Sequence, residues 1–255
     1  IVKEGASITN TGTFTVGTST TVLLTSGSLS VGTTTIQQLA STTISSLTGA
    51  TSTVTIAGDF TLGAGALYTS PANSTTTINL PSDTSGTTTF YATSTPTFGY
   101  LVFGGTGTTN LQTSITVANR LGIAAGRTLN SEGATITLSG SNTNSSTFPL
   151  EVTGTFTAAT STVTYSGTGA TTVASTTYAT VNWNGATTYT LGGATTVSTA
   201  GTVASGTTLA VSTFTLTATG STWTNSGSGT EGTGGKIVKA SASQFDNGSG
   251  TATSA

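Results

Sequence analysis

The sequence lacks the residue types on which most enzymatic chemistry depends. Among its 255 residues there is no cysteine, no histidine and no methionine, and only 5% are charged. Without histidine and cysteine the chain cannot form a Ser-His-Asp triad, a thiolate nucleophile, a disulfide bond or an ordinary zinc or haem site. We therefore expect a protein that is not an enzyme and that holds no metal and no cofactor.

Charge is scarce and scattered. Five basic and seven acidic residues give a formal net charge of −2, and the basic residues are Lys3, Arg120, Arg127, Lys236 and Lys239. Nucleic-acid binding requires clustered Lys and Arg, so we expect no nucleic-acid partner. Arg120 and Arg127 are expected to flank one strand or turn. The acids Asp59, Asp83, Glu132 and Glu151 are isolated in sequence, whereas polysaccharide cleavage requires several carboxylates on one face, so we expect solvated surface charges.

Long apolar runs are also absent. No stretch of 18 apolar residues occurs in the sequence, so we expect no membrane insertion. The chain begins at Ile1 and shows no basic segment followed by an apolar one. We expect either that a signal peptide has been removed or that this chain is part of a longer protein.

What the sequence contains is a pattern typical of β-strands. Thr and Ser are far more frequent than in ordinary globular chains. Thr alternates with apolar residues over 13–16, 53–56, 162–165 and 213–217, and short Gly- and Asn-containing turn clusters separate such runs. Helix-forming periodicity is almost missing, and the usual surface helix formers Lys and Glu are nearly absent. The pattern predicts an all-β protein.

Internal repetition predicts the architecture. Residues 178–221 align with residues 98–141 without a gap, and the apolar positions coincide throughout. Inside this unit the apolar anchors recur at about 20 residues, as in Trp183, Val203 and Trp223. A coil of about 20 residues with three short strands is the size of one rung of a parallel β-solenoid. We predict that fold, and tandem β-sandwich domains are the alternative.

The repeats divide the chain into segments within one continuous array, residues 1–255. Residues 1–62 are expected to form N-terminal rungs. Residues 98–153 and 154–236 are related repeat units, and 237–255 is a C-terminal assembly segment. Between them, residues 63–97 are predicted to be irregular, because Pro71, Pro81 and Pro96 interrupt the repeat. Trp183, Trp223, Phe103 and Phe156 alternate with Thr, which places them in the core.

Several segments together resemble the β-strand-repeat surface proteins of bacteria. The resemblance is carried by 176–185, 189–193, 206–209, 214–216 and 223–225, and it extends more faintly over 58–141. Such proteins are long, secreted, adhesin-like or filament-like chains. The resemblance implies an extracellular or cell-surface location and a structural role, and it implies no catalytic residues.

Both ends of the chain carry strand-forming apolar residues in place of a capping helix. These are Ile1, Val2 and Ile8 at the N-terminal end, and Ile237, Val238 and Phe245 at the C-terminal end. A solenoid without caps exposes unpaired strand edges. We therefore predict that the chain pairs with itself head to tail and forms a surface filament or stalk. Deleting 237–255 is predicted to abolish assembly.

Two further functions and one modification remain open. A repeat module of a large adhesin would have the same sequence features, with a surface polysaccharide or a host or neighbouring cell surface as partner. An ice-binding solenoid would require Thr-x-Thr arrays in register on successive rungs, with Thr196, Thr215 and Thr217 as candidates. Asn73 and Asn144 begin glycosylation-type sequons and are candidate glycosylation sites.

Overall fold

The computed structural model describes residues 6–16, 22–24, 27–36, 44–46, 52–56, 60–62, 75–80, 87–92, 95–140, 148–220, 222–231, 233–239, 244–246 and 251–253. The chain forms two compact units, each of which is described by itself. Unit 1 comprises residues 1–134 and 153–157, and unit 2 comprises residues 135–152 and 158–255.

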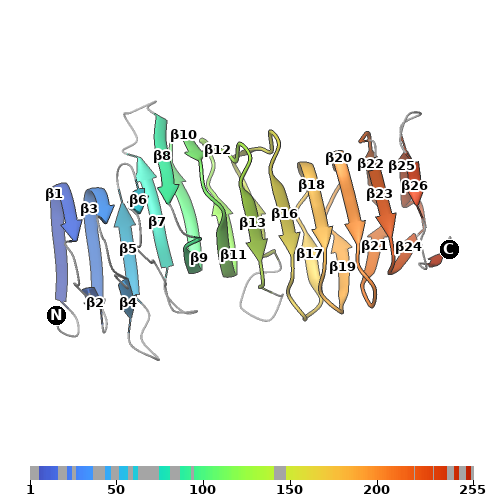
Figure 1. Cartoon of the computed structure of the whole chain (residues 1–255), viewed down its shortest axis with the longest axis horizontal. Helices are drawn as coiled ribbons and strands as arrows, with labels where there is room; N and C mark the ends of the chain where they lie inside the picture. Colours follow the sequence, from blue (N-terminus) through green and yellow to red (C-terminus); the bar gives the residue numbers. More distant parts are fainter. Residues whose placement is uncertain are drawn as a thin grey trace. The chain divides into compact units, whose positions relative to one another are not determined.

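Strands are the only regular elements in the described part of unit 1 (Figure 1). Its strands are β1 (Ala6–Val16), β2 (Val22–Leu24), β3 (Gly27–Ile36), β4 (Ile44–Ser46), β5 (Ser52–Ile56), β6 (Phe60–Leu62), β7 (Thr75–Leu80), β8 (Thr87–Ala92), β9 (Thr97–Gly105), β10 (Gly107–Leu111), β11 (Ile115–Ile123), β12 (Arg127–Asn130) and β15 (Thr155–Thr157).

Unit 2 is likewise built of strands wherever it is described. Its strands are β13 (Thr135–Leu138), β14 (Leu150–Val152), β16 (Thr162–Tyr165), β17 (Thr171–Val173), β18 (Thr177–Trp183), β19 (Thr188–Leu191), β20 (Thr195–Val203), β21 (Thr208–Ser212), β22 (Thr215–Ala218), β23 (Thr222–Asn225), β24 (Ser228–Glu231), β25 (Lys236–Lys239), β26 (Gln244–Asp246) and β27 (Thr251–Thr253).

The fold is a parallel β-solenoid with rungs about 20 residues apart, as predicted. Strands pair in parallel with strands one rung away: Thr108 pairs with Thr128, and Val181 pairs with Gly201. The spacing varies between rungs, from 18 residues between Val163 and Val181 to 30 between Phe60 and Phe90. The alternative of tandem β-sandwiches is wrong, because sandwiches are built from antiparallel strands.

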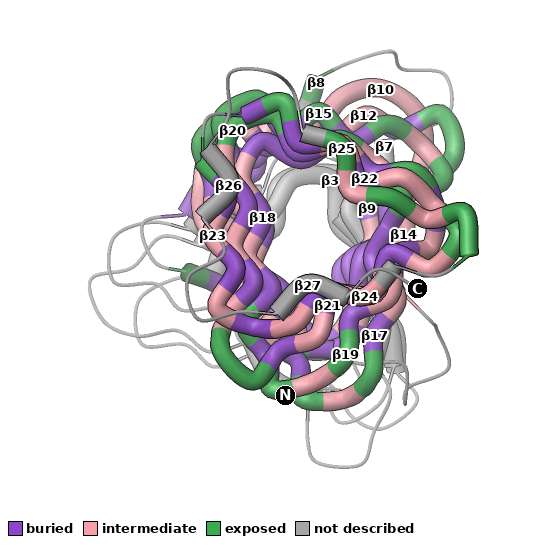
Figure 2. Tube along the Cα trace, turned by 90° about the vertical axis from the view of Figure 1, so that its right-hand side faces the viewer, coloured by how far each residue is buried: buried purple, intermediate pink, exposed green. Residues whose placement is uncertain are grey.

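Residues that pair in register across successive strands form columns, and each column points either inward or outward. In β16 the pattern is strict: Thr162 and Thr164 are half-buried, whereas Val163 and Tyr165 are buried. Thr, Val and Ile are restricted at χ1 and suit a pleated strand with one face in the core. The buried residues line the inside of the winding in Figure 2. The predicted core aromatics are confirmed, since Trp183, Trp223, Phe103 and Phe156 are all buried.

Three faces surround the core of unit 2 (Figure 2). The first face consists of β13, β16, β23, β26 and the C-terminal halves of β18 and β20. The second face is the five-stranded sheet of β17, β19, β21, β24 and β27. The third face consists of the N-terminal halves of β18 and β20 together with β22 and β25.

Glycine in the left-handed region makes the tight turns that lead into some strands. Gly126 has a φ of 80° and Gly206 a φ of 79°. In these turns the Arg127 N–H donates to the Ala124 carbonyl at 3.0 Å, and the Thr207 N–H donates to the Ala204 carbonyl at 3.1 Å. Such a φ favours glycine because a Cβ would clash with the backbone. The recurrence of this turn in both units is a local sign of the repeat.

The segment 63–97, which was predicted to be irregular, contains two strands that continue the neighbouring columns. Strand β7 pairs with β5 and β9, and β8 pairs with β6 and β10. Pro96 is buried, and its carbonyl accepts a hydrogen bond of 3.0 Å from the Thr116 N–H. Pro71 and Pro81 lie outside the described residues.

Candidate functional site

A regular surface of the described chain is a double column of threonine on the first face of unit 2, which we call the threonine array. Its two outward columns run across five successive strands. The first column is Thr135, Thr162, Thr180, Ala200 and Thr222, and the second is Thr137, Thr164, Asn182, Thr202 and Thr224. Eight of these ten positions are threonine, none is charged, and none is buried.

The array follows directly from strand geometry. Alternate residues on a strand lie about 6.6 Å apart on one face, and neighbouring strands are about 4.8 Å apart. An in-register parallel stack therefore repeats one hydroxyl and one methyl group on a two-dimensional lattice. Such a surface can donate and accept hydrogen bonds without carrying charge.

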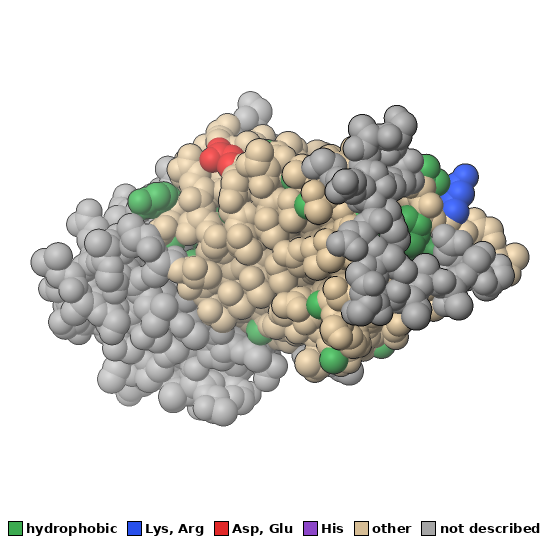
Figure 3. Space-filling model, turned by 45° about the vertical axis from the view of Figure 1, so that its right-hand side comes forward, with side chains coloured by type: hydrophobic (Ala, Val, Ile, Leu, Met, Phe, Trp, Pro, Cys, Tyr) green, Lys and Arg blue, Asp and Glu red, His purple; other side chains and the backbone are tan. Residues whose placement is uncertain are grey.

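The second face of unit 2 carries a column of the same length, and the third face carries a shorter one. On the second face Thr172, Thr190, Ala210, Thr230 and Thr253 are stacked. On the third face Thr177, Thr196 and Thr217 are stacked, but Val238 ends the column. The sequence-based candidates Thr196 and Thr217 are thus neighbours in register, whereas Thr215 pairs with Lys236. The view in Figure 3 shows few charged groups among predominantly uncharged polar side chains and backbone.

A cluster of three buried tyrosines lies in the core of unit 2. The hydroxyl oxygens of Tyr165 and Tyr178 are 2.7 Å apart, and the Tyr178 hydroxyl donates to the Ala174 carbonyl at 3.0 Å. The Tyr189 hydroxyl donates to the Gly167 carbonyl at 2.8 Å. The rings meet edge to face, with centroids 6.3 Å apart for Tyr165 and Tyr178 and 5.9 Å for Tyr165 and Tyr189.

Burial shifts the acidity of these phenols, because it disfavours the charged phenolate. It raises the pKa of Tyr189 to about 12. The pKa values of Tyr165 and Tyr178 are also raised, mainly by burial, and in Tyr178 further by the neighbouring Tyr165. The phenols therefore stay neutral at ordinary pH. Tyr189 ties adjacent rungs together through hydrogen bonds from its hydroxyl to the backbone carbonyls of Tyr165 and Gly167.

Arg127 is a charged residue whose burial the sequence did not predict. It lies at the start of β12, next to the turn that precedes this strand, and its side chain is fully buried. Its Nη1 donates to the Thr106 carbonyl at 2.7 Å and its Nη2 donates to the Thr109 hydroxyl. It pairs in register with Gly107, which has no side chain and leaves room for the guanidinium. Desolvation lowers the pKa of Arg127.

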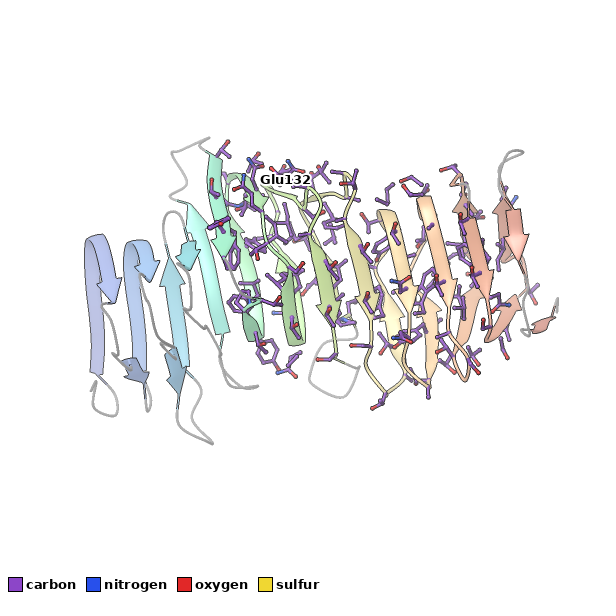
Figure 4. All side chains as sticks on the ribbon, viewed as in Figure 1. Glu132 is labelled. Carbon is purple, nitrogen blue, oxygen red and sulfur yellow. The ribbon has the colours of Figure 1, made fainter. Side chains whose placement is uncertain are left out.

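The acidic residues form no described site. Asp59 and Asp83 lie outside the described residues. Glu132, labelled in Figure 4, lies in the turn after β12 with a φ of 42°, and its N–H donates to the Asn130 side chain at 3.4 Å. Over the described ranges, no three residues among His, Cys, Asp and Glu come together to form a metal site.

The end rungs carry the residues that the sequence predicted for assembly. We define the N-terminal rung as β1 with β2, and the C-terminal rung as β25, β26 and β27. Ile8 in β1 pairs with Leu29, and Phe245 in β26 pairs with Trp223. Ile237 is half-buried beside Leu216, and the next residue, Val238, is 38% exposed. The predicted assembly residues Ile1 and Val2, and the sequon residues Asn73 and Asn144, lie outside the described residues.

Comparison with known proteins adds no assignment. The chain matches no protein-family model, no curated protein and no solved structure. In the part of the chain with described coordinates, no helix has the length and apolar character needed to cross a membrane. The function therefore has to be inferred from the geometry of the outward columns and of the end rungs.

Proposed function

We propose that this chain is a structural subunit of an extracellular, cell-surface filament or stalk, built by head-to-tail stacking of rungs and without catalytic activity. The observation that carries the proposal is the parallel pairing of strands from rung to rung, which includes the first and the last described strands. Strand β1 pairs with β3, and β25, β26 and β27 pair with β22, β23 and β24.

Two properties of the solenoid support a mechanical role. Parallel pairing from rung to rung distributes an axial load over many backbone hydrogen bonds. The described surface offers mostly uncharged hydroxyl groups, and charge repulsion between copies is therefore small. The partners of the chain are expected to be further copies of itself. A stalk built from these copies is expected to adhere to a surface polysaccharide or to a neighbouring cell surface.

Negative-stain electron microscopy of the purified chain over a series of concentrations tests this function. We expect unbranched fibres of uniform width whose number and length increase with concentration, because stacking is a bimolecular step. Monodisperse short rods at every concentration would contradict self-assembly and would favour a repeat module within a longer adhesin.

The threonine array favours ice binding as a second candidate function. Its lattice of hydroxyl and methyl groups is uncharged and extends over five strands in register. A rigid surface of this kind can hold ordered water at many points at once. The buried tyrosines behind the first face contribute to that rigidity.

Thermal hysteresis, the gap between the melting and freezing points of a seeded solution, tests the second candidate. If the array binds ice, the wild-type chain shows a gap, and Thr202→Tyr abolishes it because the ring breaks the lattice. Thr190→Tyr on the second face is the matched control and should leave the gap unchanged. Absence of a gap in the wild-type chain, or equal loss in both variants, would exclude the array as an ice-binding surface.

A further inference from the structure

Asn184 and Gly185 lie at the corner that follows β18 in unit 2. Asn184 is exposed, and Gly185 behind it is buried. Because glycine has no Cβ, no side chain on Gly185 shields its backbone nitrogen from the neighbouring Asn184 side chain. In an asparagine followed by glycine, the side-chain amide therefore reacts readily with the main chain, without an enzyme. The corner is a candidate site of self-modification.

The reaction at such a pair is a deamidation. The Gly185 nitrogen gives up its proton and forms a bond to Cγ of Asn184. The bond from Cγ to the side-chain nitrogen breaks, and that nitrogen leaves as ammonia. The resulting succinimide ring takes up a water molecule and opens to aspartate or to isoaspartate. The net change replaces an amide by a carboxylate, with water consumed and ammonia released, and it needs no oxidant or reductant.

The corner is packed so closely that the Gly185 backbone is confined. Gly185 belongs to a stack of buried corner residues from successive rungs of unit 2, which are Gly140, Gly167, Gly185, Thr207 and Gly227. A Cβ at Gly185 would collide with the Gly167 carbonyl, and a Cβ at Gly167 would collide with the Gly140 carbonyl. The backbone of the corner is thus held between the rungs on either side.

Hydrogen bonds fix the main chain on both sides of the peptide that has to rotate. The Asn184 N–H donates to the Tyr165 carbonyl at 2.8 Å. The Gly185 carbonyl accepts one hydrogen bond of 2.8 Å from the Thr187 N–H and another from the Thr207 hydroxyl. Cyclisation requires the peptide between Asn184 and Gly185 to turn until its nitrogen faces Cγ of Asn184. That movement strains these contacts, so it requires a local opening of the corner.

The Tyr189 hydroxyl lies beside the reacting nitrogen. It donates to the Gly167 carbonyl at 2.8 Å, and a Cβ at Gly185 would collide with it. Burial raises the pKa of Tyr189 to about 12, and a hydrogen bond from the Gly185 backbone opposes that rise. A hydrogen bond that lowers the pKa of a phenol is donated to its oxygen, and the backbone donor of Gly185 is its N–H. Tyr189 therefore holds the nitrogen that would attack.

We infer that Asn184 is a self-modification site, and that the folded corner holds its deamidation back through the Thr207 hydroxyl on the Gly185 carbonyl and the Tyr189 hydroxyl beside the Gly185 nitrogen. The inference is independent of the proposed function. Asn184 follows Asn182, a member of the threonine array, by two positions. Each reaction thus adds a negative charge at the end of an uncharged surface, and the isoaspartate product also lengthens the main chain there.

Peptide mapping by mass spectrometry measures the reaction. The full chain is incubated at mildly alkaline pH, either folded or in concentrated urea, and is then digested with pepsin. In urea, Asn184 and Asn247, each followed by glycine, should deamidate at similar rates. In the folded chain Asn184 should react more than about tenfold more slowly than in urea, because only the opened corner reacts. Asn184→Gln should remove the signal, since the longer side chain closes a less favourable ring.

A first pair of variants tests the hydroxyl on the carbonyl. Thr207→Val keeps the shape of the buried side chain and removes its hydrogen bond to the Gly185 carbonyl. It should raise the folded-state rate at Asn184 by about two- to tenfold. The matched control is Thr195→Val, because Thr195 is also buried but its hydroxyl donates to the Gly193 carbonyl, at 3.1 Å. The control should leave the rate at Asn184 unchanged.

A second pair tests the hydroxyl beside the nitrogen. Tyr189→Phe removes it and should raise the folded-state rate at Asn184 by a similar factor, about two- to tenfold. In the matched control Tyr165→Phe, the lost hydroxyl is the one that lies 2.7 Å from the Tyr178 hydroxyl, so the contact with Gly185 remains. Far-UV circular dichroism during the incubation checks that all four variants stay folded.

Three results would overturn the inference. Equal rates at Asn184 in the folded chain and in urea would show that the corner does not hold the reaction back. No deamidation at Asn184 in urea, while Asn247 reacts, would show that Asn184 is not a self-modification site. Equal acceleration by Thr195→Val and Thr207→Val would show that general loosening of the fold governs the rate. Each result is read independently of whether the chain forms fibres.

Discussion

Replacement of Gly201 by alanine is expected to lower the free energy of unfolding by about 1–3 kcal/mol, although it adds only one methyl group. Gly201 pairs in register with Trp223, and a Cβ at Gly201 would lie 2.3 Å from the Trp223 ring. The indole is almost fully buried and packs on Trp183, with ring centroids 5.8 Å apart. Because protein interiors are closely packed, the added methyl group forces the ring or the strand to shift.

Urea unfolding of four variants measures this effect. Trp223→Leu makes room beside position 201, so Gly201→Ala should cost much less in that background, and the difference is the coupling energy of the pair. Gly229→Ala is the matched control, because it is also a strand glycine but a Cβ there meets nothing within 4 Å. If Gly201→Ala lowers the free energy of unfolding equally in both backgrounds, the Trp223 indole does not occupy the space beside Gly201.

Alkaline pH is expected to unfold the protein well before its backbone is chemically affected. The pKa of Tyr189 is about 12 in the folded chain, and the pKa values of Tyr165 and Tyr178 are raised as well, whereas an unfolded tyrosine titrates near 10. The folded state thus holds these protons more tightly. The stabilisation is fully present below about pH 10 and is lost as the pH rises through the folded pKa values, by up to about 1.4 kcal/mol per pH unit for each tyrosine.

Thermal unfolding between pH 8 and pH 12, with tyrosinate absorbance recorded in parallel, measures this dependence. We expect a constant midpoint up to about pH 10 and a steep fall above it. Tyr189→Phe removes one titrating group and should reduce the slope above pH 10, in addition to a uniform loss from the hydrogen bond to Gly167. Titration of all tyrosines near pH 10 without a change in stability would contradict the buried cluster.

The fold could be predicted because its signals are local. Alternation of Thr with Val, Phe or Trp within four or five residues decides which side chains face the core, and it held at Phe103, Phe156, Trp183 and Trp223. The recurrence of anchors at about 20 residues indicated one rung per repeat, and Val203 does pair with Trp183 across that distance. Interruption by proline was a weaker guide, because β7 and β8 lie between the prolines and keep their register.

The candidate surfaces were harder to predict from the sequence. Thr196, Thr215 and Thr217 were chosen by spacing, yet longer threonine stacks in register lie elsewhere, and one of them consists of Thr87, Thr108, Thr128 and Thr155 on consecutive strands of unit 1. Rungs differ in length by several residues, so a fixed offset in sequence does not identify which threonines are neighbours. One residue more or less in a rung moves a side chain to the opposite face.

Sequence alone determined the fold class of the protein: an all-β chain, free of histidine and cysteine, wound into short strands whose inward residues are mostly apolar or aromatic. Only the tertiary structure decided which residues share a column. It placed Arg127 inside the solenoid, next to Gly107 in register. It brought Tyr165, Tyr178 and Tyr189 into one cluster. It also set Trp223 over Gly201. The physical reason is that alternation is imposed by the geometry of a single strand, whereas register depends on the turns between strands and on packing across rungs.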